Sequence, residues 1–259
     1  RFIDLNNVKR GNFRFGKVSA EYGKASIAYL DKALALIKSG EIDCLVTCPI
    51  SKEAVHKAGF TYSGHTEYFS ALTRCRNLAM MLLNDRLKFT LVTRHIPLKD
   101  VVLKLSQEKI SLAVNLSFHA LRDLFGIKNP RIIIAGLNPH ASDNGTIGSE
   151  ELRVISPVVK RLAKGGMNLV GPVSADIAIA RAARKDYDCV IVTYHDQALI
   201  PLKLLGNESG VNITLGLPFV RTSALHGTAF DIAGKRIATA ASLISAIKLA
   251  VQCTLLQKR

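Results

Sequence analysis

Three histidines of this chain each follow a short apolar segment that has the character of a β-strand. His95 comes after residues 87–93, His140 after residues 131–135, and His195 after residues 188–193. In open α/β sheets, ligands bind outside the carboxyl ends of the strands, so three imidazoles at three such ends can converge on one point. Three neutral imidazoles with an open coordination position form a catalytic divalent-metal site. The spacings match no local signature such as HExxH, so the pattern alone leaves open three separate structural or substrate-binding histidines.

The turn Gly64-His65-Thr66-Glu67 offers hydrogen-bond donors of the kind that a phosphate or a carboxylate requires. Its simpler interpretation is the start of a helix, with Thr66 as the N-cap and Glu67 in the first turn. The pattern does not decide between a binding turn and a plain helix cap.

Two basic residues of the second half are candidates for holding an anion. Lys203 follows His195 along the chain, and Arg221 follows a strand-like segment that is bounded by Gly and Pro and contains Asn212. The planar guanidinium of Arg221 is suited to bidentate binding of an anion. Solvated surface charge is the alternative for both.

A loop that leads toward a helix brings together His226, Gly227, Thr228, Ala229 and Asp231. A Gly-containing turn at a helix start lets the backbone approach a nucleotide closely. The chain has neither a GxGxxG after a first strand nor a GxxxxGK[ST] motif, which excludes a standard Rossmann fingerprint and a P-loop.

The composition is that of a globular protein with a strong excess of positive charge. Lys and Arg number 35 against 20 Asp and Glu, which gives a formal charge of +15. This charge suggests an anionic partner, but it is scattered over amphipathic segments, Trp is absent and no nucleic-acid-binding motif occurs, so we expect no nucleic-acid partner. The five cysteines form no CxxC pair, which favours reduced thiols and a cytoplasmic location. No apolar run is long enough to cross a bilayer and no signal peptide opens the chain, so no membrane association is expected.

Apolar strand-like segments alternate with amphipathic helical segments along the whole chain. This alternation predicts an α/β protein with a largely parallel sheet. The predicted strands are residues 42–48, 78–83, 87–93, 131–135, 188–193 and 211–215. The predicted helices are residues 19–39, 51–58, 98–125 (one helix or two), 148–163, 176–184 and 242–256.

Eight motifs occur in an order that is similar to one known family. They are GHTEYF (64–69), RHIPLKDV (94–101), GLNPHA (136–141), GSEE (148–151), ADIA (175–178), YHDQALIPLK (194–203), GVNITLGLPFVRTS (210–223) and HGTAFDIAGK (226–235). Together they resemble the 4-hydroxythreonine-4-phosphate dehydrogenase family of vitamin B6 synthesis. The last motif also resembles the nucleotide loop of isocitrate and isopropylmalate dehydrogenases. The family's opening strand and Gly-rich turn have no counterpart, so we expect an N-terminal segment to be missing.

The resemblance implies a fold, a reaction and a set of roles. The fold would be two interleaved α/β/α lobes with mixed, largely parallel sheets, one lobe of about residues 1–100 and 230–259 and the other of residues 101–229. The reaction would be the oxidation of 4-phosphooxy-L-threonine at C3 by NAD or NADP, followed by decarboxylation to 3-amino-2-oxopropyl phosphate. Relatives that act on 4-phospho-threonate or 4-phospho-erythronate are the alternative. The enzyme would be a homodimer, with each active site shared between subunits.

The resemblance also assigns the candidate residues. It implies one divalent cation (zinc, magnesium or cobalt), held by His95, His140 and His195. It implies substrate binding by His65, Thr66, Lys203, Asn212 and Arg221. Catalytic roles fall to Asp176 and Lys203, and cofactor binding falls to His226, Gly227, Thr228, Ala229 and Asp231. Leu225, Arg236 and the pair Thr239-Ala240 depart from the family's usual nucleotide loop, which leaves the choice between NAD and NADP open.

Overall fold

The structure is a computed structural model that describes residues 1–9, 11, 14–62, 64–206 and 209–258. Eight strands form one continuous sheet in the order β1-β8-β7-β2-β3-β6-β4-β5. They are β1 (Cys44–Thr47), β2 (Ala79–Leu83), β3 (Lys88–Leu91), β4 (Arg131–Ala135), β5 (Asn168–Val173), β6 (Cys189–Val192), β7 (Val211–Leu215) and β8 (Val220–Ala224). Four of the pairings between these strands are parallel and three are antiparallel. The predicted α/β fold with a mixed, mostly parallel sheet is therefore confirmed.

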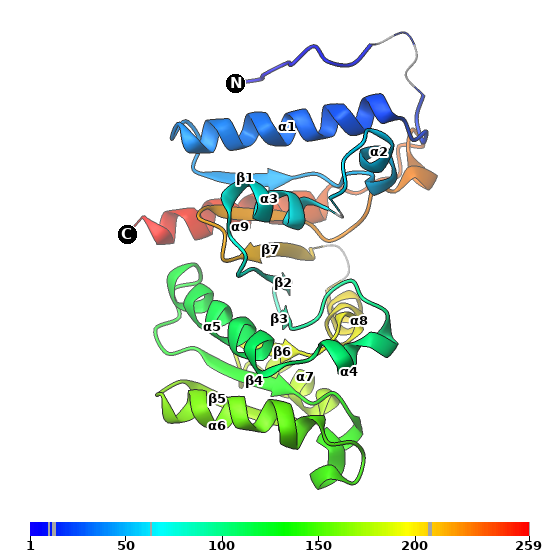
Figure 1. The fold of residues 1–259 in the computed structure, drawn as a ribbon. Coiled ribbons are helices and arrows are strands. Elements are labelled where there is room, and N and C mark those ends of the chain that lie inside the picture. Colours follow the sequence, from blue (N-terminus) through cyan, green and yellow to red (C-terminus); the bar gives the residue numbers. More distant parts are fainter. Residues whose placement is uncertain (10, 12–13, 63, 207–208, 259) are drawn as a thin grey trace.

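Helices cover both faces of the sheet (Figure 1). They are α1 (Ala20–Lys38), α2 (Lys52–Lys57), α3 (His65–Thr73), α4 (Val101–Lys104), α5 (Gln107–Asp123), α6 (Ser156–Lys164), α7 (Ala175–Ala183), α8 (His195–Leu205) and α9 (Ala241–Gln257). Residues of α5, α6 and α9 share one apolar cluster, whereas α7 and α8 contribute to a second and α1, α2 and α3 to a third. The division into two lobes stays a prediction.

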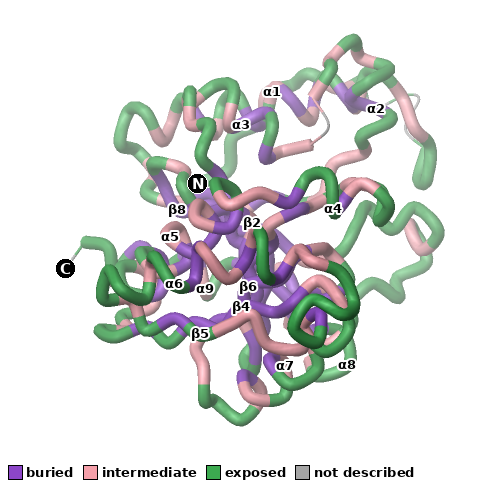
Figure 2. The backbone as a smooth tube through the Cα atoms, turned by 60° about the horizontal axis from the view of Figure 1, so that its bottom comes forward, coloured by how far each residue is buried: buried purple, intermediate pink, exposed green. Residues whose placement is uncertain are grey.

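The central strands are apolar on both sides because helices cover both faces. Ile132 and Ile134 of β4 lie in one core cluster, and Ile133 and Ala135 lie in the other. Such two-sided burial produces the continuous apolar runs from which these strands were predicted. In Figure 2 the buried backbone accordingly lies along the middle of the molecule, at β2, β4 and β6.

Three elements, β8, β5 and α8, were not predicted from the sequence, and a fourth, α3, was one of two alternatives with a different start. Strand β8 is fully buried but polar, because Arg221, Thr222 and Ser223 lie inside it. Strand β5 lies at the edge of the sheet and contains a Gly-Pro pair, as edge strands tolerate. Helix α8 contains Pro201, and helix α3 has Gly64 as its N-cap. Thr66 is therefore inside the first turn, and the interpretation of Thr66 as the cap is wrong.

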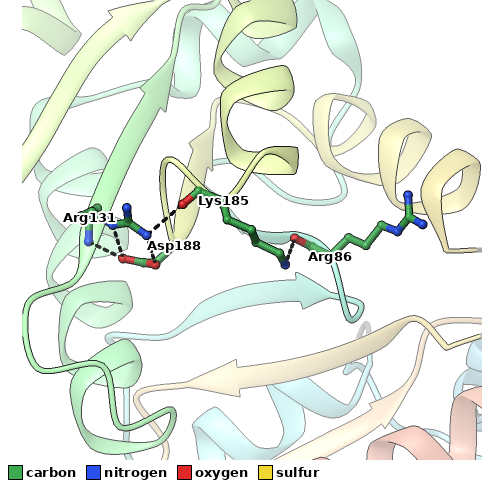
Figure 3. A network of polar contacts seen from close by, with 4 residues as sticks. All are labelled: Arg86, Arg131, Lys185 and Asp188. Atoms are coloured by element: carbon green, nitrogen blue, oxygen red, sulfur yellow. Dashed lines mark hydrogen bonds and ion pairs between the residues drawn. The ribbon is translucent and has the colours of Figure 1, made fainter.

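A polar network joins the parallel strands β4 and β6 where they begin, at the edge opposite the one from which the histidine loops leave (Figure 3). The Arg131 side chain donates to both carboxylate oxygens of Asp188, at 2.9 and 3.2 Å, and to the Lys185 carbonyl at 2.9 Å. Lys185 Nζ in turn donates to the Arg86 carbonyl at 2.8 Å, in the turn between β2 and β3. Burial opposes ionisation of Asp188, but the hydrogen bonds from Arg131 outweigh it, and the pKa of Asp188 is lowered.

Candidate active site

The strands β3, β6 and β4 are neighbours and run parallel, so their carboxyl ends meet at one edge of the sheet. His95, His195 and His140 lie on the segments that leave these three ends. The sheet order therefore satisfies the topological condition on which the metal-site prediction was based.

Buried hydrogen bonds connect these three segments to one another. Thr93 Oγ1 donates to the Thr193 carbonyl at 2.6 Å, which joins the ends of β3 and β6. The Thr193 N–H and hydroxyl both donate to Gln197 Oε1, at 2.8 and 2.9 Å. Gln197 Nε2 then donates to the Gly136 carbonyl at 2.8 Å, which joins α8 to the end of β4. We call Thr93, Thr193, Gln197 and Gly136 the strand-end relay.

His95 and His195 lie side by side, with ring centroids 5.6 Å apart. Burial, followed by the charges of Lys52 and His195, lowers the pKa of His95, which favours the neutral imidazole that a metal requires. His195 Nδ1 lies 2.7 Å from Asp196 Oδ1. A carboxylate on one ring nitrogen is the usual support for an imidazole that binds a metal through the other.

His140 lies on a backbone turn of unusual conformation. Residues 140–144 all have positive φ values, between 43° and 69°, although none is a glycine. Such backbone is strained and persists only where its surroundings fix it. Glu151, which is 1% exposed, accepts hydrogen bonds from the backbone N–H groups of Leu137 and Asn138 at 2.8 and 2.7 Å. The GSEE motif thus anchors the segment that leads to His140.

Asp176 lies on the first turn of α7, and its side chain accepts a hydrogen bond from the Ser174 hydroxyl. That hydrogen bond, further backbone hydrogen bonds and the nearby His140 lower the pKa of Asp176. Within the described ranges, no group of three or more His, Cys, Asp or Glu side chains is close enough to hold one ion. In this single chain, His95 and His195 fit two ligand positions of a metal, and His140 is not joined to them.

A cavity of about 300 Å³ next to His95 collects the predicted anion-binding residues. His65, Thr66, Asn212 and Arg221 all line it. Four side-chain atoms are buried without a hydrogen-bond partner among the described residues: His65 Nε2, Arg94 Nη1, Asn212 Oδ1 and Arg221 Nε. All four belong to residues that line this cavity, which we call the anion cavity. Buried polar groups are normally paired, so four unpaired ones around one space fit a cavity that binds a polar ligand or ordered water.

Arg221 is the most deeply buried cation of this cavity, at 2% exposure. Its Nη1 and Nη2 donate to the hydroxyls of Thr214 and Thr47, at 3.1 and 2.5 Å, and no salt bridge to it occurs in the described chain. Burial lowers its pKa to about 10. An unneutralised buried guanidinium is costly, and an anionic ligand would neutralise it. The alternative of a solvated surface charge is wrong for Arg221.

Burial and the charge of Arg221 lower the pKa of His65 to about 3. The ring stacks on Phe69, with centroids 6.2 Å apart. His65 and Thr66 also lie in the first turn of α3, whose positive dipole end therefore faces the anion cavity.

A second cavity of about 600 Å³ adjoins the anion cavity, and the two share six lining residues: Met80, His95, Asn212, Ala224, His226 and Gly227. His195, Lys203 and Ala229 line it, together with apolar side chains such as Leu199 and Leu202. We call it the loop cavity, because the predicted nucleotide loop forms one wall. Thr228 lines a different cavity beside α1 and α2, and Asp231 lies in the short helical turn Phe230–Ile232.

Sequence reasoning missed several residues of the site. Lys52 and Arg94 line the anion cavity, and Gln197 and Glu151 hold the loops that carry the histidines. Arg94 directly precedes His95, and Gln197 follows His195 by two residues. This closeness to predicted metal ligands is the one feature of the sequence that could have identified them. Nothing in the sequence distinguishes Lys52 from the other lysines.

The family described as "Pyridoxal phosphate biosynthetic protein PdxA" matches residues 2–250. The 4-hydroxythreonine-4-phosphate dehydrogenase of Sulfurihydrogenibium sp. is 48% identical over 249 residues, which are 96% of this chain and 77% of that protein. The D-threonate 4-phosphate dehydrogenase of Pectobacterium atrosepticum is 43% identical over 237 residues, which are 92% of this chain and 72% of that protein.

Solved structures are also similar to this chain in fold. A protein from Salmonella typhimurium described as a 4-hydroxythreonine-4-phosphate dehydrogenase superposes with a TM-score of 0.88 at 41% identity, over 97% of this chain and 77% of the other. Isocitrate dehydrogenase from Methylococcus capsulatus superposes with a TM-score of 0.54 at 13% identity, over 88% of this chain and 72% of the other, which shows a shared fold. No helix in the described part of the chain is long and apolar enough to cross a membrane.

Proposed function

Because the chain belongs to the PdxA family and is a dehydrogenase, we propose that it oxidises 4-phosphooxy-L-threonine at C3 with NAD or NADP. Loss of CO₂ from the resulting β-keto acid would then yield 3-amino-2-oxopropyl phosphate. The observation that carries this proposal is the anion cavity, where a buried, unneutralised Arg221 and three other residues with unpaired buried atoms surround a space beside two histidines.

In this proposal the substrate phosphate binds Arg221, with His65, Thr66 and Asn212 as further contacts. The phosphate is remote from C3, so its binding energy is available to orient the reacting carbon. Lys203 lines the same loop cavity as His195, about two turns further along α8, and would take up or supply the proton of the C3 hydroxyl. Nicotinamide would lie in the loop cavity, with residues 226–232 along the dinucleotide. The apolar Leu199 and Leu202 would exclude water there.

A divalent cation, held by His95 and His195 with His140 of the partner subunit, would stabilise negative charge on the substrate oxygen. Two observations support a homodimer with a shared site. His140 is not joined to the other two histidines within one chain. Large apolar side chains are also exposed around the His140 turn, with Ile147 at 40%, Leu152 at 50% and Ile177 at 50%. Asp176, which is held ionised near His140, would enter the site with it. Five free cysteines fit a reducing cytoplasm.

The proposal is tested with the whole natural protein. Reduction of NAD(P)⁺ should require both the phosphorylated substrate and a divalent ion, and no turnover after metal reconstitution would refute the metal-dependent reaction. His140→Ala should lower turnover by orders of magnitude while the protein stays folded. The matched control is His56→Ala, which removes an exposed imidazole on α2 and should leave turnover unchanged. Normal activity of His140→Ala would refute the metal assignment.

The alternative substrate is a phosphorylated hydroxy acid without the amino group. The similarity to a D-threonate 4-phosphate dehydrogenase, at 43% identity, favours it independently. A panel of four-carbon acid 4-phosphates that carry either an amino or a hydroxyl group at C2 would decide. The kcat/KM ratio between the two groups of substrates is the quantity to compare.

A further inference from the structure

Arg94 lies on the wall between two cavities. It lines the anion cavity and also a neighbouring basic cavity of about 590 Å³, whose lining includes Arg74, Arg76 and Glu67. Arg94 Nη1 is buried, and within the described part of the chain it has no hydrogen-bond partner. No salt bridge between described residues involves this side chain. Arg94 Nη1 is therefore a buried donor that no described residue pairs.

The two arginines that line the anion cavity, the buried Arg221 and the half-buried Arg94, come from separate parts of the sheet. Arg221 is in β8, whereas Arg94 follows β3, and β7 and β2 lie between them. Three strand spacings place the two backbone segments roughly 14 Å apart. Because both side chains line one cavity, they extend toward a shared space from different walls. This arrangement fits a small molecule that carries an anion at each end.

The charges around Arg94 are unbalanced. Lys52, Arg94 and Arg221 line the anion cavity, and Glu67 is the one carboxylate residue among its described lining. Glu67 is itself exposed to solvent, so water weakens its attraction for the arginines. A single phosphate on Arg221 would leave the Arg94 donors unpaired.

We propose that Arg94 binds the carboxylate of the substrate while Arg221 binds its phosphate. This inference rests on the proposed function and adds a specificity-determining residue to it. The planar fork of an arginine matches the two oxygens of a carboxylate, which a lysine does not. Arg94 also directly precedes His95, so a carboxylate on Arg94 would lie on the histidine side of the cavity. Arg94 then selects phosphate monoesters with an acid group over those without one.

The test compares two ligands by calorimetry, without turnover. One is 4-phospho-threonate, which has a phosphate and a carboxylate, and the other is glycerol 3-phosphate, which lacks the carboxylate. Arg94→Gln should raise the Kd of 4-phospho-threonate at least about tenfold, the size of one charged hydrogen bond, and change the Kd of glycerol 3-phosphate less than about threefold. Arg94→Lys should restore only part of the affinity. Because Arg94 leaves no described partner unpaired, Arg94→Gln should fold, and its unfolding midpoint checks this.

Arg76→Gln is the matched control. It removes the same charge from the neighbouring basic cavity, does not line the anion cavity, and should leave both Kd values unchanged. Equal weakening of both ligands by Arg94→Gln would overturn the inference, because Arg94 would then bind phosphate. No weakening of either ligand would overturn it as well. The dehydrogenase assay of the unaltered protein tests the proposed function separately: if turnover is absent while the ligand-specific loss persists, the reaction fails and the Arg94 assignment stands.

Discussion

Replacing Gln197 tests whether the strand-end relay holds the histidine loops together. Gln197→Met keeps the length of the side chain and removes its three hydrogen bonds, to the Thr193 N–H, the Thr193 hydroxyl and the Gly136 carbonyl. Thr193 is 1% exposed, and Gly136 is buried as well. Water therefore cannot replace the lost partner without local opening of the structure.

The magnitude follows from the groups that are left unpaired. The Thr193 hydroxyl can rotate toward another acceptor, but the Thr193 N–H and the Gly136 carbonyl cannot. Each buried unpaired group costs about 1–3 kcal/mol, so the two groups that Gln197→Met leaves unpaired should lower the free energy of unfolding by roughly 2–6 kcal/mol. That is a large fraction of the stability of an ordinary domain. Turnover should fall as well, because His195 and the segment before His140 lose their connection.

Urea unfolding at pH 7 measures the change. The matched control is Gln107→Met, which removes a hydrogen bond of 3.3 Å near the surface and should cost less than about 0.5 kcal/mol. Gln197→Glu adds a test of the direction in which stability changes with pH. Its second oxygen would face the Gly136 carbonyl, so the folded state favours the protonated acid and raises its pKa. The variant should therefore be closest to the natural protein below pH 4 and lose relative stability as the pH rises. If Gln197→Met lowers the free energy of unfolding by less than about 1 kcal/mol, the strand-end relay does not hold the histidine loops together.

Three other predictions concern single residues. Arg221→Met should raise the Kd of inorganic phosphate about 100-fold, while the free energy of unfolding without ligand changes by less than about 1 kcal/mol, because an unneutralised buried charge is removed; phosphate titration and urea unfolding measure the two quantities. Asp188→Asn should destabilise the fold by about 1–2 kcal/mol at pH 7. Because the pKa of Asp188 is lowered, the difference from the natural protein should shrink as the pH falls below 4, and a constant difference would contradict the ion pair with Arg131. His65, with a pKa of about 3, should show no NMR titration between pH 5 and 8; a midpoint near 6.5 would show that the ring is not buried beside Arg221.

The parts of the fold that could be predicted are those in which the local pattern of apolar and polar residues matches their burial in the structure. Strand β4 was found because Ile132, Ile133 and Ile134 are apolar on both faces. Helix α5 was predicted within residues 98–125 because the apolar residues there repeat at helical spacing; the structure adds its start, where Ser106 accepts a hydrogen bond from the Lys109 N–H. Both patterns lie within one short segment, so they can be recognised without knowing the order of the strands in the sheet.

The parts that could not be predicted depend on contacts between distant segments. The polar residues of β8 look like a loop until β1 and β7 flank them and Thr47 and Thr214 accept the Arg221 hydrogen bonds. The residues of the site were named from motifs, but their division between two cavities comes from the strand order. The separation of His140 from the pair His95 and His195 is likewise a property of the folded chain.

The site contains buried polar groups that pair with one another and buried polar groups that have no described partner. In the strand-end relay, Thr193 and Gln197 satisfy one another, which fixes the loops before any ligand binds. In the anion cavity, Arg221, Arg94 and Asn212 each keep a buried atom that no described residue pairs, and such an atom costs free energy until a ligand or water pairs it. A ligand that pairs them must therefore stabilise the fold, by about 2.7 kcal/mol at a concentration of 100 times its Kd. The groups that pair with one another lie on the segments that carry His195 and lead to His140, and the groups with unpaired atoms belong to residues that line the anion cavity.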